Sequence, residues 1–88
     1  MALLKAAQEG SISKCRHLLE AGGDVGERDK SSFTPLLLAA QEGHPGVCEL
    51  LLGRGRVDIE ETTPDDKNTA LKIAATKGHT TTLALLLT

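Results

Sequence analysis

The sequence predicts an all-α repeat solenoid, formed by a single domain of 88 residues. The first observation is that the five residues 6–10 (AAQEG) recur at 39–43, which is 33 positions later. The second is that the pair Gly43-His44 returns at 78–79 after 35 positions. Self-similarity at a period near 33 residues is typical of stacked supersecondary units, each of which buries a face against its neighbour. The chain offers about three units, which is the minimum for such a stack.

The central unit, residues 34–55, predicts two short helices separated by Gly43-His44. Thr34 is a suitable N-cap for the first helix, and Pro35 suits the first turn, where a missing N–H costs nothing. Gly55 stands where a left-handed residue is expected to end the second helix. The same pattern predicts the helices and connections of the flanking units. We expect helices at 3–9 and 12–21 with Ser11 as a cap, a β-hairpin finger at 22–33, a second finger at 56–68, and helices at 70–77 and 80–87.

The motifs of this unit resemble those of the ankyrin-repeat family, whose signature is T-P-L-H-x-A. The resemblance rests on Thr34-Pro35-Leu36, on Ala39-Ala40, on the Gly-His pair and on Leu51-Leu52 leading into Gly55. It implies stacked helix–turn–helix repeats with β-hairpin fingers, at approximately 1–22, 23–55 and 56–88. The sequence departs from the family at the signature histidine. That position holds Leu4, Leu37 and Lys72.

Charge and hydropathy exclude several classes of partner. The net charge is −2, and Lys and Arg do not cluster, so we expect no nucleic-acid binding. No apolar run approaches 18 residues, so we expect no membrane partner. Met1 leads directly into the first repeat and not into a signal sequence. These features favour a cytoplasmic location, with a nuclear location as the alternative.

The two ends of the stack differ in polarity. In the first repeat Lys5, Lys14 and His17 stand where the second repeat has Leu38, Val47 and Leu50. This difference predicts an N-terminal face that is turned to water, as a terminal capping repeat requires. The last repeat shows no such change. We therefore expect an open apolar C-terminal end, which indicates a longer parent protein or a homodimer through Leu71, Leu83 and Leu86.

The residues that could support catalysis are better explained by structure. His44 and His79 belong to the repeated Gly-His step and are expected to satisfy backbone groups there. No H-x-x-x-H or C-x-x-C spacing predicts a metal site, and no glycine pattern matches a phosphate loop. Cys15 and Cys48 are expected to be small buried residues too far apart for a disulfide. We therefore expect no enzyme activity, no metal and no cofactor.

The most probable function by this reasoning is a protein–protein interaction module that uses the fingers and the concave face of the first helices. Phe33 has two interpretations, an exposed anchor for a partner or a ring folded over Leu37. The acidic pairs 60–61 and 65–66 are either a solvated turn or a contact patch for a basic partner. The alternative function is a structural segment of a longer array, or a scaffold attached to an enzyme or channel. The candidate partner-binding residues are Arg28, Lys30, Phe33, Leu37, Gln41, Glu61, Asp65, Asp66 and Lys72.

Overall fold

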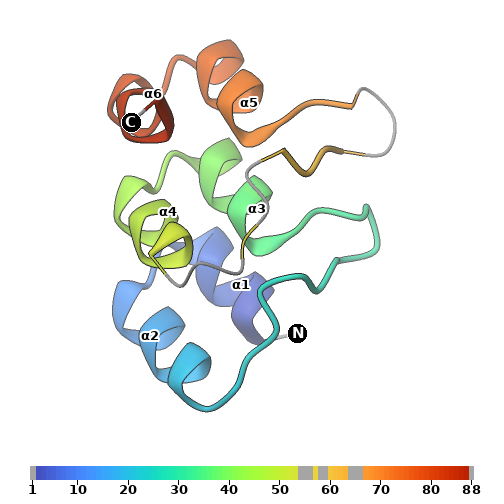
Figure 1. The fold of residues 1–88 in the computed structure, drawn as a ribbon, viewed down its shortest axis with the longest axis vertical. Coiled ribbons are helices and arrows are strands. Elements are labelled where there is room, and N and C mark those ends of the chain that lie inside the picture. Colours follow the sequence, from blue (N-terminus) through green and yellow to red (C-terminus); the bar gives the residue numbers. More distant parts are fainter. Residues whose placement is uncertain (1, 54–56, 58–59, 64–66, 88) are drawn as a thin grey trace.

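The computed structural model describes residues 2–53, 57, 60–63 and 67–87, and these residues form six helices in three antiparallel pairs (Figure 1). The helices predicted at 3–9, 12–21, 70–77 and 80–87 are confirmed to within a residue, whereas the second helix of the central unit ends at Leu52 with Gly53 at its C-cap, earlier than predicted. The position of Gly55, the predicted helix terminator, lies outside the described residues. The helices are α1 (Ala2–Glu9), α2 (Ile12–Glu20), α3 (Pro35–Glu42), α4 (Pro45–Leu52), α5 (Ala70–Lys77) and α6 (Thr80–Leu87).

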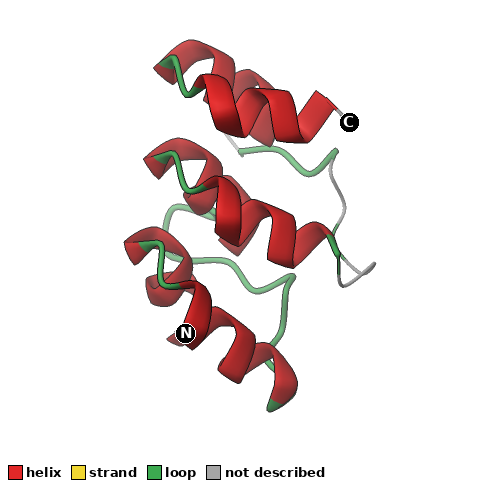
Figure 2. Ribbon diagram, turned by 90° about the vertical axis from the view of Figure 1, so that its left-hand side faces the viewer, coloured by secondary structure: helices red, strands yellow, loops and turns green. Residues whose placement is uncertain are grey.

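The helix pairs stack into two rows. In the inner row α3 packs between α1 and α5, and in the outer row α4 packs between α2 and α6. Figure 2 shows the three pairs lying one above another, and Figure 1 shows the long connections between the pairs on the side of the inner row. This arrangement confirms the predicted all-α repeat solenoid.

Side-chain oxygens cap the N-termini of three helices at the predicted positions. The hydroxyl of Thr34 accepts a hydrogen bond from the Leu37 N–H, and Thr69 caps α5 in the same way through the Lys72 N–H. Ser11 likewise caps α2. These bonds satisfy N–H groups that lack a partner inside the helix, and such a cap is worth about 1 kcal/mol.

The core consists of leucine, alanine and small residues, because paired helices in this stack approach one another closely. Residues 34–40 are all buried, since α3 has a neighbour on each side. Val47, Cys48 and Leu51 of α4 complete the central layer. Cys15 and Cys48 are both fully buried and free, as predicted.

The fingers are turns closed by one backbone pair, and the described residues contain no extended strand. In the first finger the Asp29 N–H donates to the Phe33 carbonyl at 3.0 Å. In the second finger Thr63 and Asn68 form the equivalent bond, and Thr62 and Thr69 form an isolated antiparallel bridge. The predicted hairpins are therefore present only as single pairings in the part of the chain that is described.

Each Gly-His step joins two repeats. The imidazole Nε2 of His44 lies 2.9 Å from the Gln8 carbonyl oxygen, and the Nε2 of His79 lies 3.0 Å from that of Gln41. The ring of His44 lies over Gly10, and the ring of His79 lies over Gly43. These two glycines have left-handed φ angles of +79° and +74°, respectively. The predicted structural role of the two histidines is confirmed.

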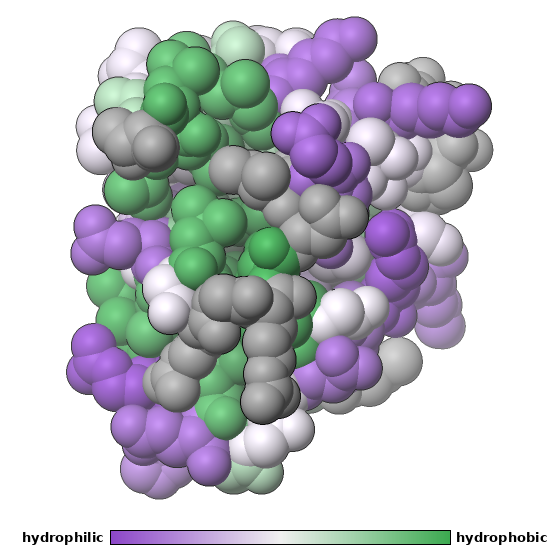
Figure 3. Space-filling view, in the orientation of Figure 1, coloured by the Kyte–Doolittle hydropathy of each residue, from purple (hydrophilic) through white to green (hydrophobic). Residues whose placement is uncertain are grey.

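The N-terminal face of the stack is polar, as predicted. Lys5, Lys14 and His17 are exposed, whereas Leu38 and Val47 are buried at the matching positions. Figure 3 shows the difference along the outer row, where apolar atoms gather over α6 and α4 and hydrophilic atoms dominate at the lower end.

The C-terminal end needs a correction. Leu86 was expected on an open apolar strip, but it is only 6% exposed because it packs into the core cluster. Leu71 and Leu83 are half-buried and pack against the same cluster. The most exposed apolar side chain of this last pair is Leu87, at 67%.

Candidate interaction surface

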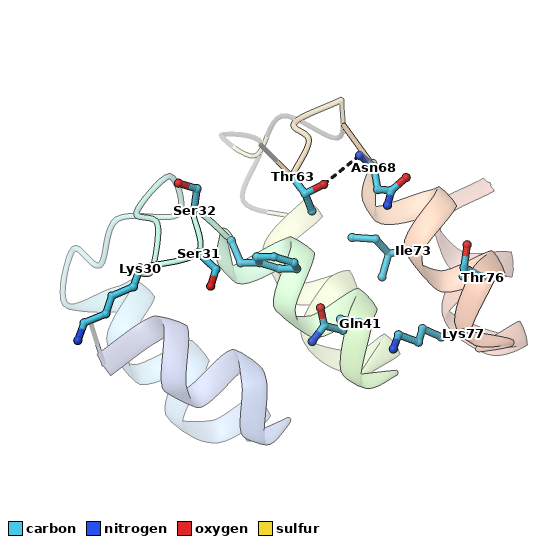
Figure 4. Close-up of a pocket in the computed structure, with 10 residues that line it drawn as sticks. Lys30, Ser31, Ser32, Gln41, Thr63, Asn68, Ile73, Thr76 and Lys77 are labelled. Atoms are coloured by element: carbon cyan, nitrogen blue, oxygen red, sulfur yellow. Dashed lines mark hydrogen bonds between the residues drawn. The ribbon is translucent and has the colours of Figure 1, made fainter. Parts of the chain in front are cut away.

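A groove of about 540 Å³ runs across the second and third repeats on the side of the fingers. The first finger contributes Lys30 and Phe33, and α3 contributes Gln41. The second finger contributes Thr63 and Asn68, and α5 contributes Ile73, Thr76 and Lys77. Figure 4 shows these elements surrounding one hollow, with Ile73 between the labelled polar side chains. Segments far apart in the sequence therefore form one concave surface.

The first finger is shaped by Asp29. Its Oδ1 accepts hydrogen bonds from the Ser31 N–H at 2.8 Å and from the Phe33 N–H at 2.9 Å. Ser32 adopts a left-handed φ of +64° within this turn. Aspartate favours such turns because its short side chain can replace a backbone acceptor. The result is that Phe33 enters the groove from a fixed backbone.

Phe33 has features of both interpretations that the sequence left open, because it is neither fully exposed nor fully buried. It is half-buried and packs against the core cluster, and it also lines the groove. A half-buried aromatic ring retains contact area for a partner at little cost in side-chain entropy.

Arg28 connects the two fingers. Its guanidinium Nη1 donates to the Ser32 carbonyl at 2.5 Å and to the Thr62 carbonyl at 3.3 Å. The side chain is nevertheless exposed. Arg28 therefore holds one wall of the groove against the other and retains donors that a partner could use.

The remaining predicted contact residues differ in how accessible they are to a partner. Leu37 is fully buried, so its prediction as a partner contact is wrong. It lies in the first turn of α3, which faces the neighbouring helices and not the groove. Gln41 lines the groove, and Lys30 and Lys72 are exposed. Asp65 and Asp66 lie outside the described residues.

Glu61 has a structural partner. Its Oε1 accepts a hydrogen bond from the hydroxyl of Thr34, which is itself fully buried. The same hydroxyl accepts from the Leu37 N–H, so the finger is joined to the start of α3.

Glu27, which was not predicted from the sequence, forms a similar hydrogen bond to the first repeat. Its Oε1 accepts from the Leu4 N–H at 3.3 Å, near the start of α1. In the second repeat the corresponding N–H is that of Leu37, which Thr34 caps. The detectable signal was a glutamate at the same place in both fingers, two residues after Val25 and Ile59.

The groove combines polar and apolar groups. Hydroxyl, amide and ammonium groups surround the apolar side chains of Phe33 and Ile73. Within the described ranges no three His, Cys, Asp or Glu side chains converge to hold a metal ion. In the same ranges no helix has the length and hydropathy required to cross a bilayer.

Stacked helix pairs, finger turns and Gly-His steps together define a repeat protein of the helix–turn–helix solenoid class. A family model for three copies of the ankyrin repeat matches residues 3–88. The chain belongs to the ankyrin-repeat family, a general protein–protein interaction module that is not itself catalytic.

Several longer proteins contain similar segments. The chain is 34% identical over 77 residues to the putative palmitoyltransferase ZDHHC13 of Danio rerio, covering 88% of this chain and 12% of that protein. It is 40% identical over 78 residues to the human ankyrin repeat and KH domain-containing protein 1, covering 89% of this chain and 3% of the other. It is 38% identical over 87 residues to human transient receptor potential cation channel subfamily A member 1, covering 93% of this chain and 7% of the channel. The chain thus spans a small part of these relatives.

Proposed function

We propose that the chain binds a partner protein through the groove between its two fingers. The observation that carries this proposal is the position of Phe33, which is half-buried and lines a groove formed by two repeats. Aromatic side chains in such positions supply a large share of binding free energy in protein interfaces. The two fingers that contribute to the groove are also linked by Arg28.

Capture of partners by wild-type and variant chains tests this proposal. We expect Phe33→Ala to weaken capture by about 1–2 kcal/mol, which is typical for the loss of an interface anchor. Arg16→Ala is a matched control, because Arg16 is exposed on α2 in the outer row. Far-ultraviolet circular dichroism should show the same helicity in both variants. Equal recovery of the same partners by Phe33→Ala and wild type would contradict the proposal.

A second candidate function is favoured by the apolar C-terminal end and by the small share of each relative that the chain covers. In that case the repeats would be a structural segment of a longer array, or a scaffold for an enzyme or channel region elsewhere. Gly78 supports this alternative, since no other element of the described chain lies within 4 Å of the position its Cβ would take, whereas Gly10 and Gly43 are each covered by a histidine. A further helix pair could occupy that place.

Self-association is another use of the same end. A homodimer would bury Leu71 and Leu83, and Leu87 adds exposed apolar surface, but Leu86 would take no part because it is buried. Light scattering across a concentration series tests this. Leu83→Glu should shift a dimer to monomer, and Lys14→Glu should not, because Lys14 lies in the polar first repeat. A wild-type chain that stays monomeric at millimolar concentration would exclude the homodimer.

A further inference from the structure

The chain carries a net charge of −2, yet the described residues that line the groove include two lysines and no acid. Lys30 comes from the first finger and Lys77 from the end of α5. Lys72 lies four residues before Thr76 on α5, so it projects from the same helix face. All three lysines are exposed, and none has an ion-pair partner among the described residues.

Three carboxylates on the neighbouring elements do not line the groove and accept hydrogen bonds from the protein itself. Asp29 directly precedes Lys30 in the first finger, and its Oδ1 accepts from the Ser31 and Phe33 amides. Glu42 does not line the groove and accepts a hydrogen bond from the Gln41 amide at 3.4 Å. Glu61 is held by Thr34.

The repeats themselves show that Lys77 is not required by the fold. The corresponding position holds Glu9 in α1 and Glu42 in α3, at the ends of the equivalent helices. Lys72 similarly replaces Leu4 and Leu37, which are both buried. The last inner helix therefore carries two cations that the other two inner helices lack at these sites.

We infer that the groove selects an acidic polypeptide segment, in which carboxylates flank one apolar side chain. The apolar side chain would pack against Phe33 and Ile73, and the carboxylates would pair with Lys30, Lys72 and Lys77. Ser31, Thr63, Asn68 and Thr76 provide hydrogen-bonding groups for the backbone of the segment. This inference rests on the proposed function, because it names the chemistry of the partner at the same groove.

Selection from a random peptide library displayed on phage, with the 88-residue chain as the immobilised target, tests the inference. We expect the selected peptides to be rich in Asp and Glu around an apolar residue. Their synthetic forms, followed by fluorescence anisotropy, should bind about threefold more weakly to each of Lys30→Gln and Lys77→Gln, as expected for partly exposed ion pairs. Binding should also weaken with added salt, because the Debye screening length falls from about 10 Å at 0.1 M to about 3 Å at 1 M.

Lys77→Glu and Lys14→Glu form a matched pair of charge reversals. Glutamate is native to the first two repeats at the place of Lys77, so Lys77→Glu should fold normally and bind at least threefold more weakly. Lys14→Glu makes the same change on α2, away from the groove, and should bind as wild type does.

The possible failures are distinguishable. Basic or neutral peptides that lose binding in Phe33→Ala but not in the lysine variants would overturn the acidic preference and leave the groove as the binding site. Basic peptides would further direct attention to the acidic residues of the second finger. If no selected peptide responds to Phe33→Ala, both the inference and the proposed function are overturned.

Discussion

The imidazole of His79 joins the third repeat to the second, because its Nε2 lies 3.0 Å from the carbonyl oxygen of Gln41. His44 makes the same contact with Gln8 one repeat earlier. The carbonyl belongs to the last turn of an inner helix, where the helix itself offers no donor. The histidine therefore satisfies a group that would otherwise lack a partner and fixes the spacing of neighbouring repeats.

Replacing this ring should loosen the stack. We expect His79→Ala to lower the free energy of unfolding by about 1–2 kcal/mol, from the lost hydrogen bond and the lost packing over Gly43. Urea denaturation followed by circular dichroism measures the change. His17→Ala is the control, since His17 is exposed on α2 and should alter stability by less than about 0.5 kcal/mol. Equal effects of the two changes would mean that the inter-repeat bond contributes nothing measurable.

Alanine substitutions at Gly43 and Gly78 distinguish the cost of backbone strain from the cost of crowding between repeats. Both have a φ of +74°, but a Cβ on Gly43 would lie 2.7 Å from His79 Nδ1, whereas no other element of the described chain comes within 4 Å of a Cβ on Gly78. Gly78→Ala should therefore cost about 1 kcal/mol, the penalty for a left-handed L-residue. Gly43→Ala should cost clearly more, measured by the same urea titrations.

The double variant Gly43→Ala/His79→Ala completes this comparison. Because the ring that meets the new methyl group is absent, its cost should be less than the sum of the two single costs. A cost of the double variant equal to the sum of the two single costs would show that the crowding between the new methyl group and the His79 ring is relieved by other means.

Thr34 should matter more than its counterpart Thr69. The hydroxyl of Thr34 caps Leu37 and also donates to Glu61, whereas Thr69 is less buried and caps Lys72. We expect Thr34→Val to cost about 2–3 kcal/mol and Thr69→Val about 1 kcal/mol, since the first removes two hydrogen bonds from a buried site. Thermal and urea unfolding of the two variants gives the comparison. A larger loss in Thr69→Val would contradict the role assigned to Glu61.

Burial of the two cysteine thiols makes the free energy of unfolding depend on pH in the alkaline range. It raises the pKa of the Cys48 thiol to about 12 and also raises that of Cys15. The unfolded thiol ionises first, near pH 8.5, so this contribution to stability is complete below that pH and is lost between about pH 9 and pH 12. Between pH 8 and pH 10 wild type should lose about 2 kcal/mol more stability than Cys48→Ala, which lacks the thiol. Parallel pH profiles in the two proteins would contradict the assigned burial effect.

The helices and their caps were predictable from sequence because short-range chemistry determines them. Thr34, Pro35 and Ser11 act locally, and the repeat period supplied the pairing of the helices. The roles of His44 and His79 followed from their recurrence. The polarity of Lys5, Lys14 and His17 likewise identified the water-facing end.

The errors arose where a side chain's direction depends on the neighbouring element. Leu37 was placed at the partner surface, but the N-terminal turn of α3 directs it into the core between α1 and α5. Leu86 was placed on an open face, but it packs inside the last repeat. Glu27 was overlooked because its partner, the Leu4 N–H, lies 23 residues away, and a contact at that separation becomes visible only in the fold.

Amide chemical shifts provide a direct test of whether partners bind in the groove between the fingers. A ¹⁵N-labelled chain would be titrated with the tightest peptide from the library selection. We predict shift changes concentrated at Ser31, Phe33 and Thr76, with Arg16 on α2 and Glu49 on α4 unaffected. Changes concentrated on the outer helices, with the finger amides unmoved, would contradict it.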